Sequence, residues 1–369
     1  MTIADLAPDY VRAIAPYQPG KPISDVAREL GMSEAEIIKL ASNENPLGAS
    51  PKALAAIQGA IKDLALYPDG GGVALKATIA TKFGVASDAI ILGNGSNDVL
   101  ELAARTFMKA GDSAVFSQYA FAVYPLATQA VGATPIEAPA LDFGNDLEAI
   151  LEAITPTTKI VFVANPNNPT GTFIPGEMLK AFIAQVPSNV LVVLDEAYGE
   201  YLDPAEAYQS APWLSTFPNL LISHTLSKAY GLAGLRIGFG LASPAIIAMM
   251  NRLRQPFNVN HLAMVAAEAA LNDDEFIARS RQLNAEGLAM LSAELAKRGI
   301  EYIPSRGNFI AFKIGRTGEV NQHLLRAGII VRPVASYGLP DYLRVSTGTK
   351  AQNARFIAAL DAARAELKV

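Results

Sequence analysis

The sequence predicts an α/β protein, in which a mainly parallel sheet is covered by helices on both faces and a smaller α+β domain follows. Between about residues 89 and 240, short β-branched or apolar runs alternate with stretches of helical periodicity. Runs that are apolar on both faces and separated by helix-length segments are typical of parallel strands buried on both sides. The chain has 369 residues, of which 51% are hydrophobic and 18% charged, which is enough to bury the cores of two or three domains.

Five apolar runs are the expected strands of the large sheet. They are AIIL (89–92), SAVFS (113–117), KIVFVA (159–164), VLVVL (190–194) and LLISH (220–224). A helix is expected over Asn97–Lys109, directly after the first of these strands. The start APYQPGKP (15–22) contains glycine and prolines, so we interpret it as an irregular arm.

The last third of the chain predicts the smaller α+β unit. The segment from His261 to Arg298 is interpreted as one long helix. The expected strands are EYIPS, NFIAFKI, IIVRPV and YLRVS, with helices near Val320–Ala327 and over Ala351–Leu367. We therefore divide the chain into residues 1–44, an N-terminal arm with part of the small domain, 45–260, the large domain, and 261–369, the small domain.

Composition and charge exclude several classes of function. A net charge of -5, a pI near 5.4 and the lack of lysine or arginine runs argue against nucleic-acid and anionic membrane partners. The acidic start MTIADLAPDY lacks the pattern of a signal peptide, and the longest nearly apolar stretch, Ile237–Met250, is shorter than the ~18 residues of a membrane span. The chain has no cysteine, which excludes disulfides and thiolate chemistry and fits a cytoplasmic protein.

Three short motifs and the three histidines each partly match a known binding or catalytic pattern, but each lacks residues that the pattern requires. LGNGSND (92–98) follows a strand and opens a helix but lacks the last glycine of a dinucleotide fingerprint, which leaves a smaller phosphate site and a plain tight turn as alternatives. LVVLDEA (191–197) resembles the magnesium-binding strand of ATPases, yet the sequence contains no phosphate-binding loop. His224, His261 and His323 lack the spacing of metal ligands, so no metal site is expected. TLSK has threonine where an S-x-x-K enzyme needs its serine.

Polar residues gather at the carboxyl ends of the predicted strands. Ser96 and Asn97 follow AIIL, Asn168 lies in NPNNPTG after KIVFVA, Asp195 ends VLVVL, and Lys228 follows LLISH. In an open α/β sheet these strand ends form the crevice in which ligands bind. A lysine that can act as a nucleophile, an aspartate and a phosphate cradle at one edge together predict pyridoxal 5'-phosphate as the cofactor.

The chemistry of that cofactor gives each side chain an expected role. Apolar surroundings favour the neutral, nucleophilic amine of Lys228, and the carboxylate of Asp195 would keep the ring nitrogen protonated. Tyr198 and Asn168 could contact the ring's phenolic oxygen. Phe121 or Tyr119 could stack on the ring, although ordinary core packing explains an aromatic residue there equally well. Phosphate contacts are expected from Ser96, Asn97, Thr225, Ser227 and Arg236.

Several of these motifs together resemble one known family. NPNNPTG, LDEAY, SKAYGLAGLRIGF and LRVSTGT resemble the fold-type-I, aspartate-aminotransferase-like enzymes that depend on pyridoxal phosphate. Within that family, IKLASNENPLG (38–48), YPDGG (67–71), YAFAVY (119–124) and GIIVRP (328–333) resemble the histidinol-phosphate aminotransferases. The resemblance covers residues 17 to 348 and implies a seven-stranded, mainly parallel sheet in the large domain.

The resemblance also implies roles for individual residues. Lys228 matches the family's cofactor-linked lysine, Asp195 the partner of the ring nitrogen, and Asn168 and Tyr198 the contacts to the ring oxygen. Ser96, Asn97, Ser227 and Arg236 match contacts to the phosphate. Tyr67 matches a tyrosine that reaches the phosphate of the neighbouring subunit, which implies a homodimer with shared active sites. Phe121 stands where many members have a stacking tyrosine, so this chain would stack a ring without a hydroxyl.

The substrate is expected to be bound by residues from both ends of the chain. The resemblance implies that Arg344 binds the α-carboxylate of glutamate. Because the phosphate of histidinol phosphate lies close to its amine-bearing carbon, the same arginine could bind that phosphate together with Arg332. Either arginine could instead be a solvent-facing charge at a strand edge. Tyr17 resembles a tyrosine that closes over the substrate, and Asn43 belongs to the same substrate-binding set. The expected reaction passes the amino group of glutamate to imidazole-acetol phosphate in histidine synthesis, with Lys228 moving the proton.

Three other functions stay open at this point. The chain could act on aromatic or a broad range of amino acids, or it could resemble a threonine-phosphate decarboxylase. A protein of this fold could also bind the cofactor without catalysis and regulate something, although no DNA-binding extension precedes the domain.

Overall fold

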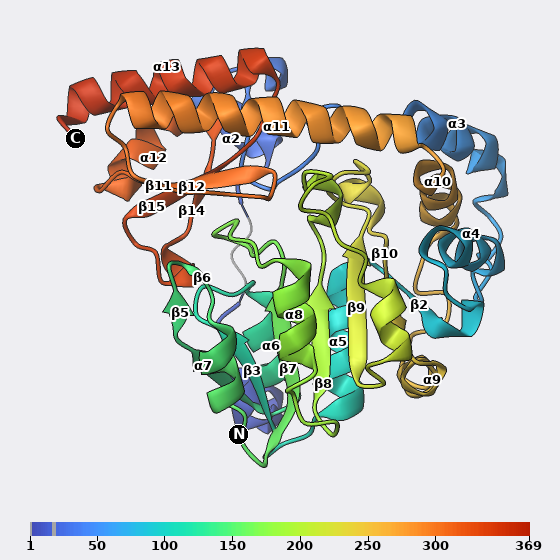
Figure 1. Ribbon diagram of the computed structural model, residues 1–369. Helices are drawn as coiled ribbons and strands as arrows, with labels where there is room; N and C mark the ends of the chain where they lie inside the picture. Colours follow the sequence, from blue (N-terminus) through green and yellow to red (C-terminus); the bar gives the residue numbers. More distant parts are fainter. Residues whose placement is uncertain (1, 17–19) are drawn as a thin grey trace.

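A seven-stranded sheet lies at the centre of the larger part of the molecule (Figure 1). The computed structural model describes residues 2–16 and 20–369. The strands of this sheet are β2 (Ile90–Gly93), β3 (Ser113–Ser117), β4 (Thr134–Ala138), β7 (Thr158–Ala164), β8 (Leu191–Asp195), β9 (Leu220–Thr225) and β10 (Gly238–Ala242). Their order is β2-β10-β9-β8-β7-β3-β4, and β10 runs antiparallel to both of its neighbours while the other pairs are parallel. The predicted mainly parallel sheet is confirmed.

Strands β4 and β10 are the two that the apolar runs did not indicate. β4 lies at the edge of the sheet, where only Ala138 of its residues is buried, and it contains Pro135, a residue that sheets tolerate at an edge. β10 contains Gly238, where a Cβ would come within 2.5 Å of the backbone nitrogen of Ser96 and 2.7 Å of the carbonyl oxygen of His224. Glycine therefore lets β10 approach the turn that precedes α5 (Ser96–Phe107). Because glycine is not a large apolar residue, β10 does not form an apolar run that predicts a strand.

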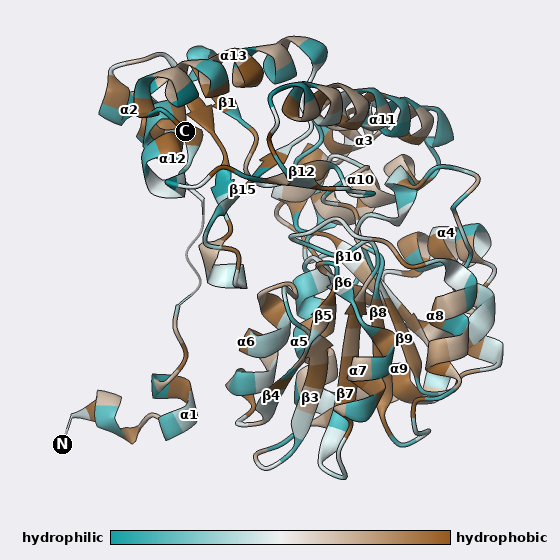
Figure 2. Cartoon of the chain, turned by 60° about the vertical axis from the view of Figure 1, so that its left-hand side comes forward, coloured by the Kyte–Doolittle hydropathy of each residue, from teal (hydrophilic) through white to brown (hydrophobic). Residues whose placement is uncertain are grey.

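Two helical layers cover the sheet, because successive side chains of each buried strand point to opposite faces. In β7, Val161 and Val163 join the core beneath one layer, whereas Ile160 and Phe162 join the core beneath the other. The first layer contains α3 (Pro51–Ala60), α4 (Val73–Phe83), α7 (Leu147–Glu152), α8 (Gly176–Ile183) and α10 (His261–Leu271), and the second contains α5, α6 (Val123–Ala130) and α9 (Pro244–Asn251). Figure 2 shows the hydrophobic strands enclosed between these helices.

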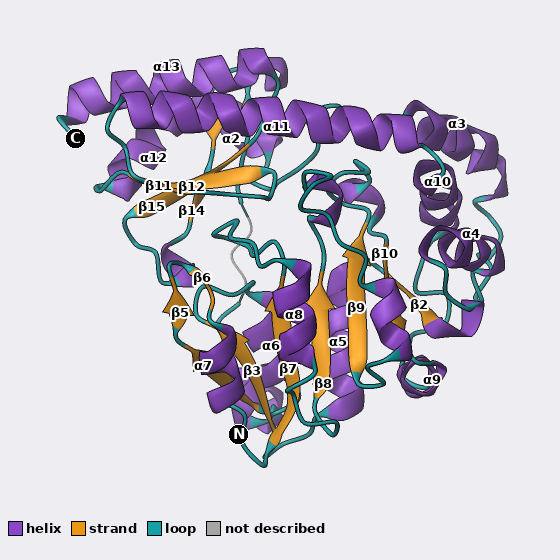
Figure 3. Cartoon of the chain, viewed as in Figure 1, coloured by secondary structure: helices purple, strands orange, loops and turns teal. Residues whose placement is uncertain are grey.

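A smaller α+β unit lies beyond the carboxyl ends of the large sheet (Figure 3). Its four-stranded sheet has the order β11 (Tyr302–Ile303), β12 (Phe309–Lys313), β15 (Tyr342–Ser346) and β14 (Arg332–Pro333). The long helices α11 (Asp274–Lys297) and α13 (Lys350–Leu367) and the shorter α12 (Thr317–Arg326) share a core with this sheet. The early segment β1 (Ile38–Lys39) pairs with β13 (Ile329–Ile330), so residues near the start of the chain belong to this unit.

Apart from short 3-10 helices, the remaining described elements are two helices and a hairpin. They are α1 (Asp9–Arg12), α2 (Ile23–Leu30) and the hairpin of β5 (Ala140–Leu141) and β6 (Gly144–Asn145). None of the helices in the described part of the chain has both the length and the apolar character needed to cross a membrane.

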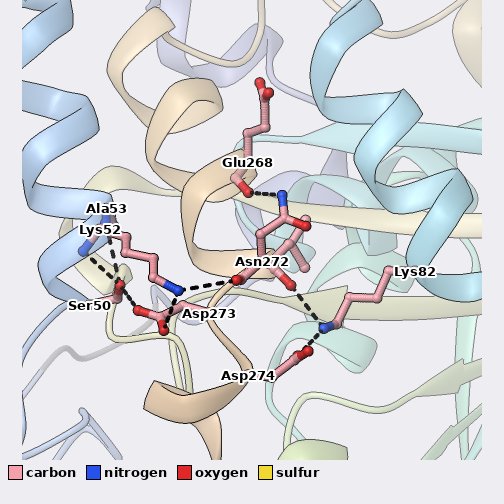
Figure 4. A network of polar contacts seen from close by, with 9 residues as sticks. Ser50, Lys52, Ala53, Lys82, Glu268, Asn272, Asp273 and Asp274 are labelled. Atoms are coloured by element: carbon pink, nitrogen blue, oxygen red, sulfur yellow. Dashed lines mark hydrogen bonds and ion pairs between the residues drawn. The ribbon is translucent and has the colours of Figure 1, made fainter.

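The single long helix expected from His261 to Arg298 is wrong, because the chain breaks at Asn272 and Asp273 between α10 and α11. At this break, the carboxylate of Asp273 accepts a hydrogen bond from the Ser50 hydroxyl and pairs with Lys52 at 3.1 Å (Figure 4). These contacts tie the break to the start of α3. Since α10 packs into the core of the large sheet, we propose that the small domain begins after α10 instead of at residue 261.

Candidate active site

One pocket opens at the carboxyl ends of β7, β8 and β9 and at the N-terminal end of α5, where the small unit faces the large sheet. The sequence-predicted residues that line it are Asn43, Ser96, Asn97, Phe121, Asn168, Asp195, Tyr198, Thr225, Ser227, Lys228, Arg236, Arg332 and Arg344. These positions span about three hundred residues of sequence, so the fold brings the predicted set together. The pocket is also lined by Glu44, Tyr124 and Tyr337, which the sequence analysis did not name.

Lys228 lies in the loop after β9 and is half-buried. Its Nζ donates to the carbonyl oxygen of Ser42 at 3.0 Å and lies 6.0 Å from the centre of the Tyr198 ring. Burial lowers the pKa of Lys228 to about 8, and the positive charges of Arg344 and Arg236 act in the same direction. A substantial fraction of the amine is therefore neutral near physiological pH, as a nucleophile requires.

Asp195 is the last residue of β8 and is buried. Its Oδ2 accepts a hydrogen bond from the hydroxyl of Tyr124 at 2.9 Å, while its Oδ1 is buried without a hydrogen-bond partner among the described residues. Burial raises the pKa of Asp195 to about 6, although the Tyr124 hydroxyl, the Ala197 backbone and Lys228 oppose that rise. The unpartnered oxygen, on a residue that lines the pocket, provides an acceptor for a ligand.

Asn168 and Tyr198 are connected to residues of the small unit and the N-terminal segment. Nη1 of Arg344 donates to Oδ1 of Asn168, and Nη2 donates to the carbonyl oxygen of Ala41 at 2.9 Å. The hydroxyl of Tyr198 accepts from Nδ2 of Asn43 at 2.9 Å, and burial raises the pKa of Tyr198 to about 12. The protonated Tyr198 hydroxyl keeps its own donor for a ligand.

The N-terminal end of α5 lines the pocket and is a place where backbone N–H groups can bind a phosphate. Its capping residue, Gly95, has a φ of 87° and carries no side chain that could accept from the first backbone N–H groups of the helix. A Cβ at Gly95 would come within 2.4 Å of Nη2 of Arg236, so glycine also leaves room for the guanidinium. Nη1 of Arg236 donates to the Ser227 hydroxyl at 3.3 Å, which places two predicted phosphate contacts together. This arrangement favours the phosphate interpretation of LGNGSND over a plain turn.

Of the two aromatic candidates for ring stacking, Phe121 lines the pocket, whereas Tyr119 packs against Phe143 with ring centres 5.8 Å apart. The Tyr119 carbonyl accepts from Nδ2 of Asn167, which supports the loop that carries Asn168. Phe121 is therefore the better candidate to stack on a bound ring.

The small unit contributes two arginines to the pocket. Arg332 on β14 and Arg344 on β15 are direct partners in an antiparallel pair. Arg344 is buried, and its guanidinium carbon lies 5.0 Å from the centre of the Phe309 ring. Both arginines line the same pocket, and two guanidinium groups there create a positive potential that attracts anions. This pair therefore offers a binding site for an anionic group of a substrate, and the solvent-facing alternative is wrong for Arg344.

Among the described site residues, Tyr67 does not line the pocket. Tyr67 is 85% exposed and stacks on Phe257, with ring centres 4.9 Å apart. Tyr17 lies outside the described residues.

Tyr124 is the principal site residue that the sequence analysis missed. It is the last residue of the motif YAFAVY and lies in the first turn of α6, where its ring is buried beneath the pocket. Phe121 and Tyr119 of this motif are the predicted stacking candidates. The second tyrosine of the motif is Tyr124 itself, so the sequence contained a signal for it.

Comparison with known proteins identifies the family. Residues 35–360 match the family model for class I and II aminotransferases. The chain belongs to this aminotransferase family. It is 59% identical over 357 residues to histidinol-phosphate aminotransferase 1 of Thiobacillus denitrificans, covering 97% of this chain and 93% of that protein. It is 58% identical over 357 residues to histidinol-phosphate aminotransferase of Methylobacillus flagellatus, covering 97% of each.

The aminotransferase also superimposes on the histidinol-phosphate aminotransferase of Sinorhizobium meliloti, solved in complex with pyridoxal-5'-phosphate, with a TM-score of 0.88, 28% identity and 97% coverage of both chains.

The cofactor of these aminotransferases is pyridoxal phosphate, and the residues of the pocket fit it. Oδ1 of Asp195, which has no hydrogen-bond partner in the described part of the chain, is an acceptor suited to a protonated ring nitrogen. The open N-terminal end of α5, with Arg236 and Ser227, suits the phosphate. Lys228 would supply the amine that bonds to the aldehyde carbon, and a bound cofactor supplies a ring that withdraws electrons from the substrate.

Proposed function

We propose that this aminotransferase is a histidinol-phosphate aminotransferase, which moves the amino group of L-glutamate to imidazole-acetol phosphate. The observation that carries the substrate assignment is the pair of arginines, Arg332 and Arg344, placed opposite each other in the pocket. One anion site of this kind serves the α-carboxylate of glutamate in one half-reaction and the phosphate of the second substrate in the other. The printed names of the close relatives agree with this choice.

Each residue then has a defined task in the proposed reaction. Lys228 Nζ takes the proton from the amine-bearing carbon of glutamate and later returns a proton to the corresponding carbon of the second substrate. Asp195 holds the ring nitrogen in its protonated form, and Tyr198 donates its hydroxyl proton toward the ring oxygen. Asn168 would contact the cofactor ring, and it accepts a hydrogen bond from Arg344, which would bind the substrate. Asn168 therefore connects the cofactor site with the substrate site.

The test is a substrate panel on the purified holoenzyme under identical conditions. With L-glutamate as donor, we expect kcat/KM to be at least ~10²-fold higher for imidazole-acetol phosphate than for phenylpyruvate. Release of 2-oxoglutarate reports turnover, and Lys228→Ala is the matched control that should show none. An equal or greater kcat/KM for phenylpyruvate would reject the assignment in favour of an aromatic aminotransferase. Decarboxylation of threonine phosphate would point to the decarboxylase alternative.

We also propose that the enzyme works as a homodimer in which Tyr67 reaches the phosphate site of the second copy. The stretch of chain around Tyr67 carries other exposed apolar side chains, including Leu64 (60% exposed), Leu66 (68% exposed) and Val73 (70% exposed). Large apolar side chains exposed along one short segment are unfavourable in water and suit an interface with a second copy.

Mixing two defective variants tests the shared site. A dimer of one Lys228→Ala chain and one Tyr67→Ala chain would contain one site with both defects and one intact site. We expect the mixture, after subunit exchange, to be more active than either variant alone, and sedimentation to give the mass of two chains. A monomer, or a mixture no more active than its components, would contradict the shared site.

A further inference from the structure

Tyr124 joins two of the proposed cofactor contacts from beneath the pocket. Its hydroxyl donates to Oδ2 of Asp195 at 2.9 Å. Its ring meets the ring of Phe121 edge to face, with centres 5.8 Å apart at 85°. The residue that orients the ring-nitrogen partner therefore also supports the residue proposed to stack on the ring.

The position of Tyr124 is fixed by its own packing. Its ring stacks on Phe162 of β7, with centres 4.8 Å apart and planes 5° apart, and the residue is only 1% exposed. One turn further along α6, the Thr128 hydroxyl donates to the carbonyl oxygen of Tyr124 at 2.7 Å. A buried phenol in this apolar layer needs a partner for its hydroxyl, and Asp195 provides it.

The same contact distinguishes the two oxygens of Asp195. Oδ2 is occupied by Tyr124, whereas Oδ1 has no hydrogen-bond partner among the described residues. The backbone N–H of Ala197 and the charge of Lys228 also act on this carboxylate, which interacts electrostatically with Glu196 and Tyr198 as well. We propose that Tyr124 is a positioning residue that holds Asp195 with Oδ1 presented to the cofactor's ring nitrogen and keeps that nitrogen protonated.

Removing one hydroxyl tests the proposal. In Tyr124→Phe the ring packing is kept but Asp195 loses a hydrogen bond, so its carboxylate becomes more basic and competes for the ring proton. Such a bond to a charged group is strong enough that we expect the dissociation constant of the cofactor to rise by at least ~10-fold. With cofactor labelled with ¹⁵N in the ring, the nitrogen signal of the holoenzyme should move toward the unprotonated value.

Tyr208→Phe is the matched control. The Tyr208 hydroxyl accepts from Nδ2 of Asn165 at 3.0 Å and lies on the other face of the sheet, where it contacts Glu196. We expect this variant to lose stability much as Tyr124→Phe does while the ring-nitrogen signal and the cofactor affinity stay as in the wild type. If Tyr124→Phe melts earlier but leaves the nitrogen signal and the affinity unchanged, Tyr124 is merely structural and the proposal is overturned.

The wild-type holoenzyme provides a test that does not depend on the folding of a variant. Its crystal structure should place one Asp195 oxygen on the Tyr124 hydroxyl and the other on the ring nitrogen. A Tyr124 that turns away from Asp195, or two carboxylate oxygens that both face the ring, would overturn the proposal. The inference rests on one part of the proposed function, the binding of the cofactor, and does not depend on the identity of the substrate. A wild type that binds the cofactor but does not turn over histidinol phosphate would contradict the substrate and leave the Tyr124 proposal standing.

Discussion

Asp195 and Glu196 are neighbours in sequence, yet they lie on opposite faces of the large sheet in different surroundings. Asp195 faces the pocket, with Tyr124 on one oxygen and the other without a partner among the described residues. Glu196 faces the opposite core, where it accepts from the Ser210 hydroxyl at 2.9 Å and lies 3.5 Å from Nε2 of His224. Burial raises both pKa values, to about 6 for Asp195 and about 8 for Glu196.

What separates the two acids is access to a ligand. His224, the neighbour of Glu196, is enclosed by the rings of Phe83 and Phe239 at 4.9 and 5.0 Å, and burial lowers its pKa to about 4. Glu196 and His224 are therefore both mainly neutral at pH 7. A strongly shifted pKa alone does not mark a catalytic residue, because a buried structural pair shifts just as far. Asp195 ends β8 and Glu196 follows it, so the alternation of side chains that continues past the strand end directs only Asp195 into the pocket.

Asp195→Asn should give the largest effect, since it removes the charge on the pocket side. We expect kcat/KM to fall by ~10³-fold or more, because an amide cannot hold the ring nitrogen protonated. The unfolding temperature should change little, since the substitution conserves volume and removes a poorly solvated charge. Steady-state kinetics and calorimetry on the same sample check both statements. A fall in activity explained by unfolding would count against the assigned role.

Arg344→Gln tests the contribution of the small unit to substrate binding. Arg344 is buried and linked to Asn168, so its loss should raise KM for both glutamate and imidazole-acetol phosphate by ~10²-fold. The absorbance spectrum of the bound cofactor should remain close to that of the wild type. If KM rises for one substrate only, the two half-reactions use different anion sites.

Glu196→Gln should give the smallest effect on activity, within ~3-fold of the wild type, because Glu196 does not reach the pocket. Its effect should appear in stability against pH. The folded pKa of about 8 exceeds the ordinary 4.5, so the folded state binds more protons than the unfolded state between these values. Wild-type stability is therefore lost as pH rises through this window. The unfolding temperature of Glu196→Gln relative to the wild type should rise between pH 6.5 and 8. A difference that stays constant with pH would show that Glu196 does not titrate there.

The sequence was sufficient to predict the parts of the site that depend on strand ends. The continuous apolar runs place Asp195, Asn168 and Lys228 at one edge of the sheet, because the carboxyl ends of parallel strands meet there. The contact between Tyr124 and Asp195 could not be predicted, since it depends on how the first turn of α6 packs on β7. The link from Arg344 to Asn168 likewise depends on how the small unit meets the large sheet.

Local sequence also failed where a tertiary contact decides the outcome. The break at Asn272 and Asp273 interrupts an otherwise helical pattern, and Asp273 is held by Ser50 and Lys52, which are more than two hundred residues away. Strand β10 has glycines where close approach to α5 requires them, and so it carries a weak strand signal.

The most direct test of the central claim is to locate the lysine that bonds to the cofactor. The holoenzyme is reduced with borohydride, digested, and mapped by mass spectrometry. We predict that the cofactor mass is found on the peptide containing Lys228 and on no other lysine peptide, and that Lys228→Ala protein treated in the same way carries none. A cofactor attached to a different lysine in the wild type would contradict the site described above.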